Sequence, residues 1–199
     1  GCAGHQTRPT DGSRLSASVS RDVALELERI EEAAWRDMHA SARPEDRAAL
    51  GLRGRDLSGA WVMAMDHDDS LLQNRVLGLG LDTPVTPDLL DAVLEHYRGH
   101  RHGFAVNLCP FALPAGVESL LAARGFGTFF HHLKWMRGDA PAPAAVGTLR
   151  VEAVPAERGR DWGELAARIF GSSTAHAAWA SRRVGRAGWT HYFATSGDV

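Results

Sequence analysis

A proline-rich turn stands where this sequence is best suited to bind an anion. Residues 74–81 (NRVLGLGL) have the composition of a buried strand, and residues 87–97 have the apolar spacing of a helix. A helix that follows a strand normally offers free backbone N–H groups to a phosphate. Here the connection is Asp82-Thr83-Pro84-Val85-Thr86-Pro87, whose carboxylate repels anions and whose prolines have no N–H. The pattern predicts a cofactor-binding scaffold whose cofactor loop has been rewritten.

Histidines form a second candidate site, with metal binding as the chemistry. His96 and His100 have the spacing of two ligands on one side of a helix, and His102 is close in sequence. Gly99 interrupts that helix, and no carboxylate or cysteine lies nearby at ligand spacing. The adjacent pair 131–132 is expected in a strand, where neighbouring side chains point to opposite faces. We therefore predict a solvated helix end and no metal site.

Acidic and cysteine side chains also have simple structural interpretations. Asp66, Asp68 and Asp69 resemble part of a calcium loop, but the glycine and the distant glutamate of such a loop are absent. Cys109 has apolar neighbours and precedes a proline, which favours a buried small hydrophobe over a nucleophile. Cys2 lies far from it, so no disulfide framework is indicated, and a reducing cytoplasm is the expected compartment.

These residues must be positioned by helices and strands that the apolar spacing indicates. We expect helices at 20–41, from 44 to Gly51 or Gly54, and at 87–97, 115–124, 162–170 and 176–184. We expect strands at 59–65, 71–81, 104–109, 126–136, 149–154 and 189–195, the first two forming a hairpin. The chain then divides into a flexible tail at 1–18, a domain at 19–138, a linker at 139–148 and the start of a second domain at 149–199.

Four short stretches resemble the GNAT superfamily of N-acetyltransferases in a tandem form. They are residues 74–81 (NRVLGLGL), 123–126 (ARGF), 170–171 (FG) and 185–192 (GRAGWTHY). The resemblance covers roughly residues 20–199 and implies an α/β (α+β) fold, with a mixed, mostly antiparallel sheet flanked by helices. It makes 19–138 a degenerate first copy and 149–199 an incomplete second copy. The missing initiator Met and an end at Val199 just after an apparent strand further indicate a fragment that is cut at both sides.

The resemblance also implies a cofactor and a substrate side. Active members bind acetyl-CoA through a loop of the form Q/R-x-x-G-x-G/A before a helix. Residues 182–187 (RRVGRA) match it literally but are expected after a helix and before a strand, as a basic helix end. The part of the second copy that corresponds to the acceptor-amine side contains Phe170, Ser172, Ser173, His176, Trp179 and Tyr192.

Composition narrows the class of partner. Net charge of −2 predicts no attraction to nucleic acid or membranes, and 44% hydrophobic residues are ordinary for a globular protein. The sequence thus indicates an N-acetyltransferase that moves an acetyl group from acetyl-CoA to a small-molecule or peptide amine, with this fragment inactive alone. The alternative is a non-catalytic ligand-binding or regulatory GNAT-like module. The oligomeric state and the catalytic residues are left open.

Overall fold

The chain has a mixed α/β fold, with a mostly antiparallel sheet and flanking helices. Its computed structural model describes residues 20–136, 139, 141 and 147–196. The predicted tail at 1–18 and most of the predicted linker at 139–148 lie outside the described residues.

Two helices open the described chain, as predicted. Helix α1 spans Arg21–Ala40, and the Ser20 hydroxyl accepts a hydrogen bond from the Val23 N–H at 3.3 Å. Helix α2 spans Pro44–Leu50, begins with a proline and ends at Gly51, whose φ of +63° is the left-handed conformation of a helix C-terminus.

The main sheet has four strands in the order β1-β2-β3-β4, which are Leu52–Leu57, Ala60–Met65, Arg75–Leu77 and Ala105–Val106. The pairs β1–β2 and β2–β3 are antiparallel, and β3–β4 is parallel. Helix α3 (Pro87–His96) connects the parallel pair, and α4 (Val117–Ala122) follows β4. Parallel neighbours require such a crossover, whereas the β1–β2 pair needs only the tight turn Ser58-Gly59.

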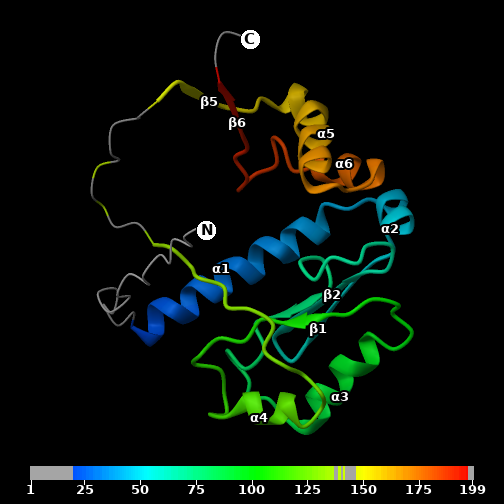
Figure 1. The fold of residues 1–199 in the computed structure, drawn as a ribbon, viewed down its shortest axis with the longest axis vertical. Helices are drawn as coiled ribbons and strands as arrows, with labels where there is room; N and C mark the ends of the chain where they lie inside the picture. The colour runs from blue at the N-terminus through cyan, green and yellow to red at the C-terminus, as the bar shows by residue number, and fades with distance from the viewer. Residues whose placement is uncertain (1–19, 137–138, 140, 142–146, 197–199) are drawn as a thin grey trace, which may run out of the picture.

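Both faces of this sheet are covered. Figure 1 shows α1 crossing one face and α3 with α4 on the other. Along β2, Val62 and Ala64 join the core with α3, whereas Met65 packs in a second cluster with Met38 of α1 and Trp179. The alternation follows from the two-residue period of a strand, and it explains why every residue of β2 but one is fully buried.

One strand was not predicted, and three predicted strands need correction, among them the strand predicted at 104–109, which is only Ala105–Val106 because the loop around Pro110 ends its pairing with β3. Strand β1 was missed because its centre is polar, and Gly54 in it leaves room for the Trp61 ring, which a Cβ would overlap. The strand predicted at 71–81 is only Arg75–Leu77, since Gly78 and Gly80 have φ near +75° and turn the chain away. It nevertheless pairs antiparallel with β2, as the predicted hairpin requires.

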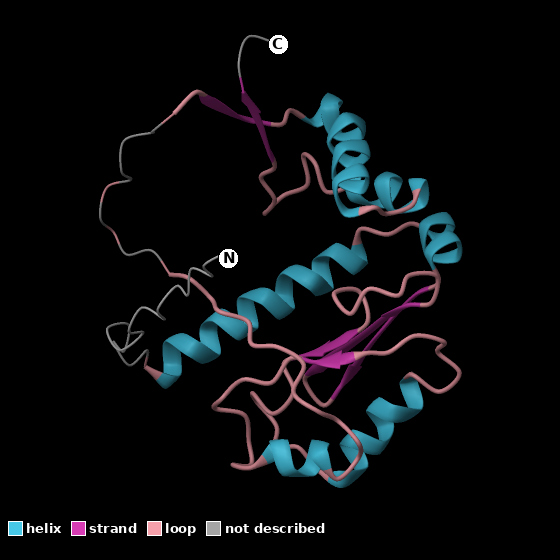
Figure 2. Cartoon of the chain, viewed as in Figure 1, coloured by secondary structure: helices cyan, strands magenta, loops and turns pink. Residues whose placement is uncertain are grey.

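The strand predicted at 126–136 was wrong. These residues have no regular secondary structure and are drawn as a loop in Figure 2. Lys134 holds the segment on α1 through Glu28 and Glu31, at 2.7 and 2.9 Å, while Phe129, Leu133 and Trp135 are more than three-quarters exposed. Residues with a high strand propensity therefore have no partner strand in the described part of the chain.

The C-terminal unit has the predicted order of strand, helix, helix, strand. Strand β5 (Leu149–Ala153) precedes a short 3-10 turn, η1 (Ala156–Arg158), then α5 (Gly159–Phe170), α6 (Thr174–Ser181) and β6 (Tyr192–Ser196). Strands β5 and β6 pair antiparallel along their whole length. The helices pack tightly, because Gly163 lets the Ala177 backbone approach where a Cβ would overlap it.

Candidate functional site

The turn between β3 and α3 is the position where the sequence predicted a lapsed coenzyme loop. The helix begins at Pro87, as expected, and Thr86 is its N-cap. The Thr86 hydroxyl accepts a hydrogen bond from the Leu89 N–H at 3.2 Å, so this N–H is already satisfied. One of the donors that a helix N-terminus would offer to an anion is therefore used internally.

A segment after β4 closes the gap beside this turn. The Leu113 N–H donates to the Gly80 carbonyl at 2.8 Å, and the Val85 N–H donates to the Leu113 carbonyl at 2.7 Å. Ligands of open α/β sheets usually bind outside the carboxyl ends of the strands, which is the place that Leu113 occupies here. The turn and the segment form one small hydrogen-bonded unit.

The electrostatics of the turn also disfavour a phosphate. The Asp82 carboxylate accepts a hydrogen bond from Arg29 of α1 at 2.5 Å, so this cation is paired already. Pro84 and Pro87 offer no N–H, and the Val85 N–H is engaged. The residues present therefore do not fit the diphosphate of acetyl-CoA, and we derive no chemical step through that cofactor.

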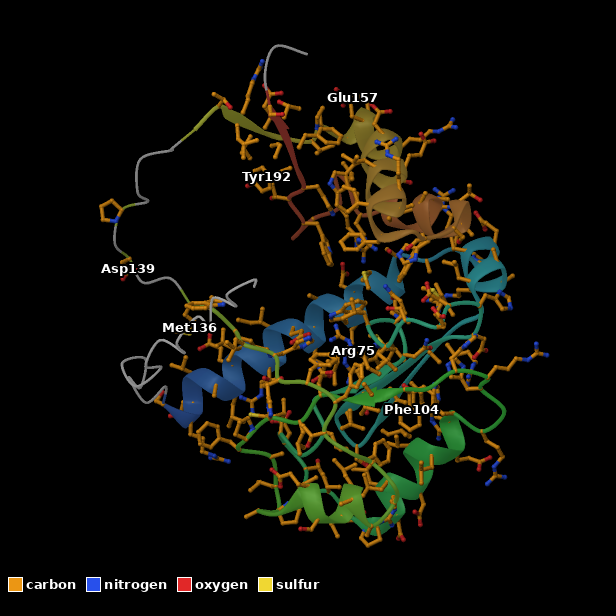
Figure 3. The ribbon with its side chains drawn as sticks, viewed as in Figure 1. Arg75, Phe104, Met136, Asp139, Glu157 and Tyr192 are labelled. Atoms are coloured by element: carbon orange, nitrogen blue, oxygen red, sulfur yellow. The ribbon has the colours of Figure 1, made fainter. Side chains whose placement is uncertain are left out.

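The predicted acceptor-side residues of the C-terminal unit are only partly brought together. Ser173 caps α6 by accepting from the His176 N–H at 3.2 Å, and the His176 and Trp179 rings lie 5.4 Å apart. Ser172 lies in the turn between the helices. Phe170 and Tyr192 are 77% and 58% exposed, and Figure 3 shows Tyr192 on β6, away from α6. Neither side chain covers a site shared with His176.

Trp179 attaches the C-terminal unit to the main domain. It is fully buried, and its indole N–H donates to the Met38 carbonyl at the end of α1, at 3.2 Å. The His39 ring meets the edges of Trp61 and Trp179 at 5.7 Å each. Burial lowers the pKa of His39 to about 4, so the imidazole is neutral near pH 7.

The string that matched a phosphate loop in sequence is used for ion pairing instead. Arg182 donates to Asp46 of α2 at 2.5 and 3.0 Å, and Arg186 donates to Asp37 of α1 at 2.8 and 2.5 Å. The Trp189 indole also donates to Asp37 at 2.6 Å. Hydrogen bonds from Arg186 and then Trp189 lower the pKa of Asp37 to about 2.

Between these arginines, Arg183 is buried, which no sequence signal indicated. Its guanidinium lies 5.4–5.9 Å from the ring centres of Trp162, Trp179 and Trp189. Its Nε and Nη1 atoms have no hydrogen-bond partner among the described residues. Burial lowers its pKa to about 10, so it is still charged at pH 7, and the aromatic faces offset part of the burial cost.

The predicted solvated helix end is wrong, because the His100 side chain is 1% exposed and the His96 Nε2 atom is buried. Within the described ranges, no group of three or more His, Cys, Asp or Glu side chains is placed to hold a metal ion. Asp66 is bound by Arg53 and His100, and Asp68 accepts from the Ser70 N–H. Cys109 is buried with Leu25 and Leu81, in agreement with its interpretation as a small hydrophobe.

The class of this protein is described by its own structure, a mixed α/β fold with a closed turn before its crossover helix. No protein-family model matches the chain. Neither a curated protein nor a solved structure matches it. Among the residues that the structure describes, no helix combines the length and apolarity that a membrane crossing requires.

Proposed function

We propose that this chain is part of a GNAT-type N-acetyltransferase, in which residues 19–138 form a degenerate copy that holds no acetyl-CoA. Residues 149–199 belong to the copy that transfers the acetyl group. The acceptor is an amine on a small molecule or a peptide, and the protein works in the cytoplasm without nucleic acid or membrane partners.

The observation that supports this proposal most is the element order around α3. Two helices precede an antiparallel run of three strands, and a helical crossover then leads to a fourth, parallel strand. The second unit encloses two helices between antiparallel strands, β5 and β6, which is the order that the resemblance implies for the start of another copy.

A second function, that of a non-catalytic ligand-binding or regulatory module, is favoured by a different observation. The end of the sheet beside α3 is closed by Leu113, while the C-terminal unit docks on α1 and α2 through Trp179, Arg182 and Arg186. A domain that holds its neighbour in place through a buried indole and two carboxylate–arginine pairs can act as a scaffold without any coenzyme.

Acetyl-CoA titration of the chain tests the closed turn. A ligand that binds the native state at a hundred times its Kd stabilises it by about 2.7 kcal/mol, so a coenzyme site produces a concentration-dependent rise in Tm. We expect no rise. A rise that Asp82→Lys enhances would contradict the closed turn, because added positive charge there strengthens binding only if the diphosphate lies beside it.

Transfer itself is tested by thiol release. A longer protein that includes this chain is mixed with acetyl-CoA and a panel of primary amines, and free CoA is followed with a thiol reagent. Amine-dependent release is expected from the longer protein and none from residues 1–199 alone. Absence of release with every amine, together with a flat acetyl-CoA titration of the longer protein, would favour the regulatory module.

A further inference from the structure

The segment that follows α4 is an extended chain without a neighbouring strand. Residues 127–136 (GTFFHHLKWM), the open segment, contain no helix, turn or bend, and every one of them is exposed. None of their backbone N–H or C=O groups is hydrogen-bonded to the backbone of another described residue. Aromatic and β-branched residues such as those at 128–130 favour strands. The open segment therefore has the composition and the extended shape of a strand, without the ladder of a sheet.

Its side chains alternate between two faces, as in a strand. Three large apolar side chains are more than three-quarters exposed, namely Phe129, Leu133 and Trp135. Lys134, between the last two, instead contacts Glu28 and Glu31 of α1, at 2.7 and 2.9 Å. Phe130 and His132 are an even number of positions from Lys134, and their rings lie 4.5 Å apart. Figure 1 shows the segment passing beside α1 in yellow-green, so one face lies toward the helix and the other toward solvent.

The edge of the open segment has none of the usual protection against pairing. Natural edge strands carry charges or prolines that prevent another chain from adding to them. Here Lys134 is the only Lys, Arg, Asp or Glu between residues 127 and 136, and that range contains no proline. The two glutamates of α1 neutralise the Lys134 charge. An extended, apolar and uncharged edge of this kind is suited to strand addition.

A second copy of the chain is the partner that matches this edge in length. The strands that the structure describes have at most six residues, so their free edges could pair with little more than half of the open segment. The same segment in another copy is equally long and equally unpaired. A two-fold rotation sets two such segments antiparallel, so that each supplies the backbone groups that the other lacks. We propose that the chain forms a two-fold dimer in which the open segments of two copies pair as antiparallel strands.

The side chains are compatible with this pairing. A two-fold axis at His132, near the centre of the segment, places Phe129 of one copy opposite Trp135 of the other. Aromatic pairs directly across an antiparallel ladder stabilise it. The same axis places Phe130 opposite Lys134, so no two like charges face each other.

The exposed area indicates a weak dimer. Phe129 and Trp135 leave on the order of 350 Å² of apolar surface in water. Each partner of a stable complex of standard size buries about 800 Å², so we expect a Kd on the order of 10–100 µM. At the low micromolar concentrations of spectroscopic unfolding the chain is then a monomer. The dimer does not depend on the proposed acetyltransferase function, because it uses neither the turn at 82–87 nor the C-terminal unit.

Sedimentation velocity of the full chain between about 5 and 500 µM measures the association. We expect a shift from monomer to dimer over this range. Hydrogen exchange followed by mass spectrometry at both ends of the range locates the interface. Amides of residues 128–136 should exchange at least tenfold more slowly at the high concentration, whereas those of β5 and β6 should not change.

Two matched pairs of variants make the test specific. Leu133→Glu puts a charge on the outer face near the axis and should raise the dimer Kd at least tenfold, whereas Leu72→Glu, at another exposed leucine, should not change it. His131→Pro removes a backbone N–H that the monomer does not use and should also prevent pairing, whereas His131→Ala keeps that N–H and should leave the dimer intact. Circular dichroism at 5 µM checks that each variant is folded.

Three results would each overturn the proposal. The first is a monomer at every concentration up to about 500 µM. The second is a dimer that folded Leu133→Glu and His131→Pro variants form as well as the unaltered chain. The third is concentration-dependent protection confined to another edge, such as β1 or β5, because the copies would then meet elsewhere.

Discussion

Replacing Trp179 by alanine should release the C-terminal unit from the main domain. The side chain is 0% exposed, and its indole N–H is bound to the Met38 carbonyl. A buried indole covers on the order of 200 Å², which at about 25 cal/mol per Å² gives an upper value near 5 kcal/mol. Large-to-small core replacements of tryptophan cost about 3–5 kcal/mol. Trp179→Ala should therefore lower the free energy of unfolding by that amount.

Urea unfolding followed by circular dichroism measures this loss, and the melting temperature should fall by roughly 6–20 °C for a chain of this size. Trp179→Phe separates the two contributions, because it keeps most of the apolar volume but leaves the Met38 carbonyl unpaired, at a cost of about 1–3 kcal/mol. Trp135→Ala is the control, since Trp135 is 80% exposed and should change stability by no more than about 0.5 kcal/mol.

The reasoning would be refuted if Trp179→Ala matched Trp135→Ala within error. It would also be refuted if the unaltered protein lost α5 and α6 at a lower urea concentration than the main sheet, because the docked unit would then contribute no stability through this indole.

Three other replacements probe single contacts. Burial lowers the pKa of His39 from 6.5 to about 4. As the pH falls between these values, the unfolded chain binds a proton that the folded chain does not, so the free energy of unfolding should drop by about 3 kcal/mol. His39→Leu should flatten that part of a plot of urea midpoint against pH. Thr86→Ala removes the cap of α3 and should cost about 1 kcal/mol in urea unfolding, with Thr83→Ala nearly silent. Gly163→Ala should destabilise by about 1–3 kcal/mol through overlap with the Ala177 carbonyl, although alanine favours helix, whereas Gly127→Ala, with open space around it, should be close to neutral in a thermal melt.

Local signals located the helices, because the residues that start and stop a helix act within a few positions. Ser20 and the prolines at 44 and 87 lie at the observed starts, and Gly51 lies at an observed end. The strands were less predictable. Residues 126–136 have suitable side chains, but a strand also needs a neighbour, which their own composition does not reveal.

The contacts that shape the candidate sites join residues far apart in the chain. His100 binds Asp66 34 positions earlier, and Arg182 binds Asp46 136 positions earlier. The sequence indicated Asp66, His100 and Arg182 as candidate functional residues. It gave no sign of the partners that these side chains bind, because those partners lie far away in the chain. Arg183 was missed for the same reason, since its tryptophan surroundings come from α5, α6 and the loop before β6.

The two ends of helix α3 have different surroundings. Its N-terminus is capped by Thr86 beside the closed turn, and Tyr97, directly after its last residue, stacks on Phe104. The helix has 10 residues and is therefore about 15 Å long, which separates the two positions by more than a screening length in physiological salt. A charge change at Asp82 should thus leave the stacking of Tyr97 on Phe104 unaltered, whereas loosening α3 itself should disturb it, because Tyr97 directly follows the last residue of the helix.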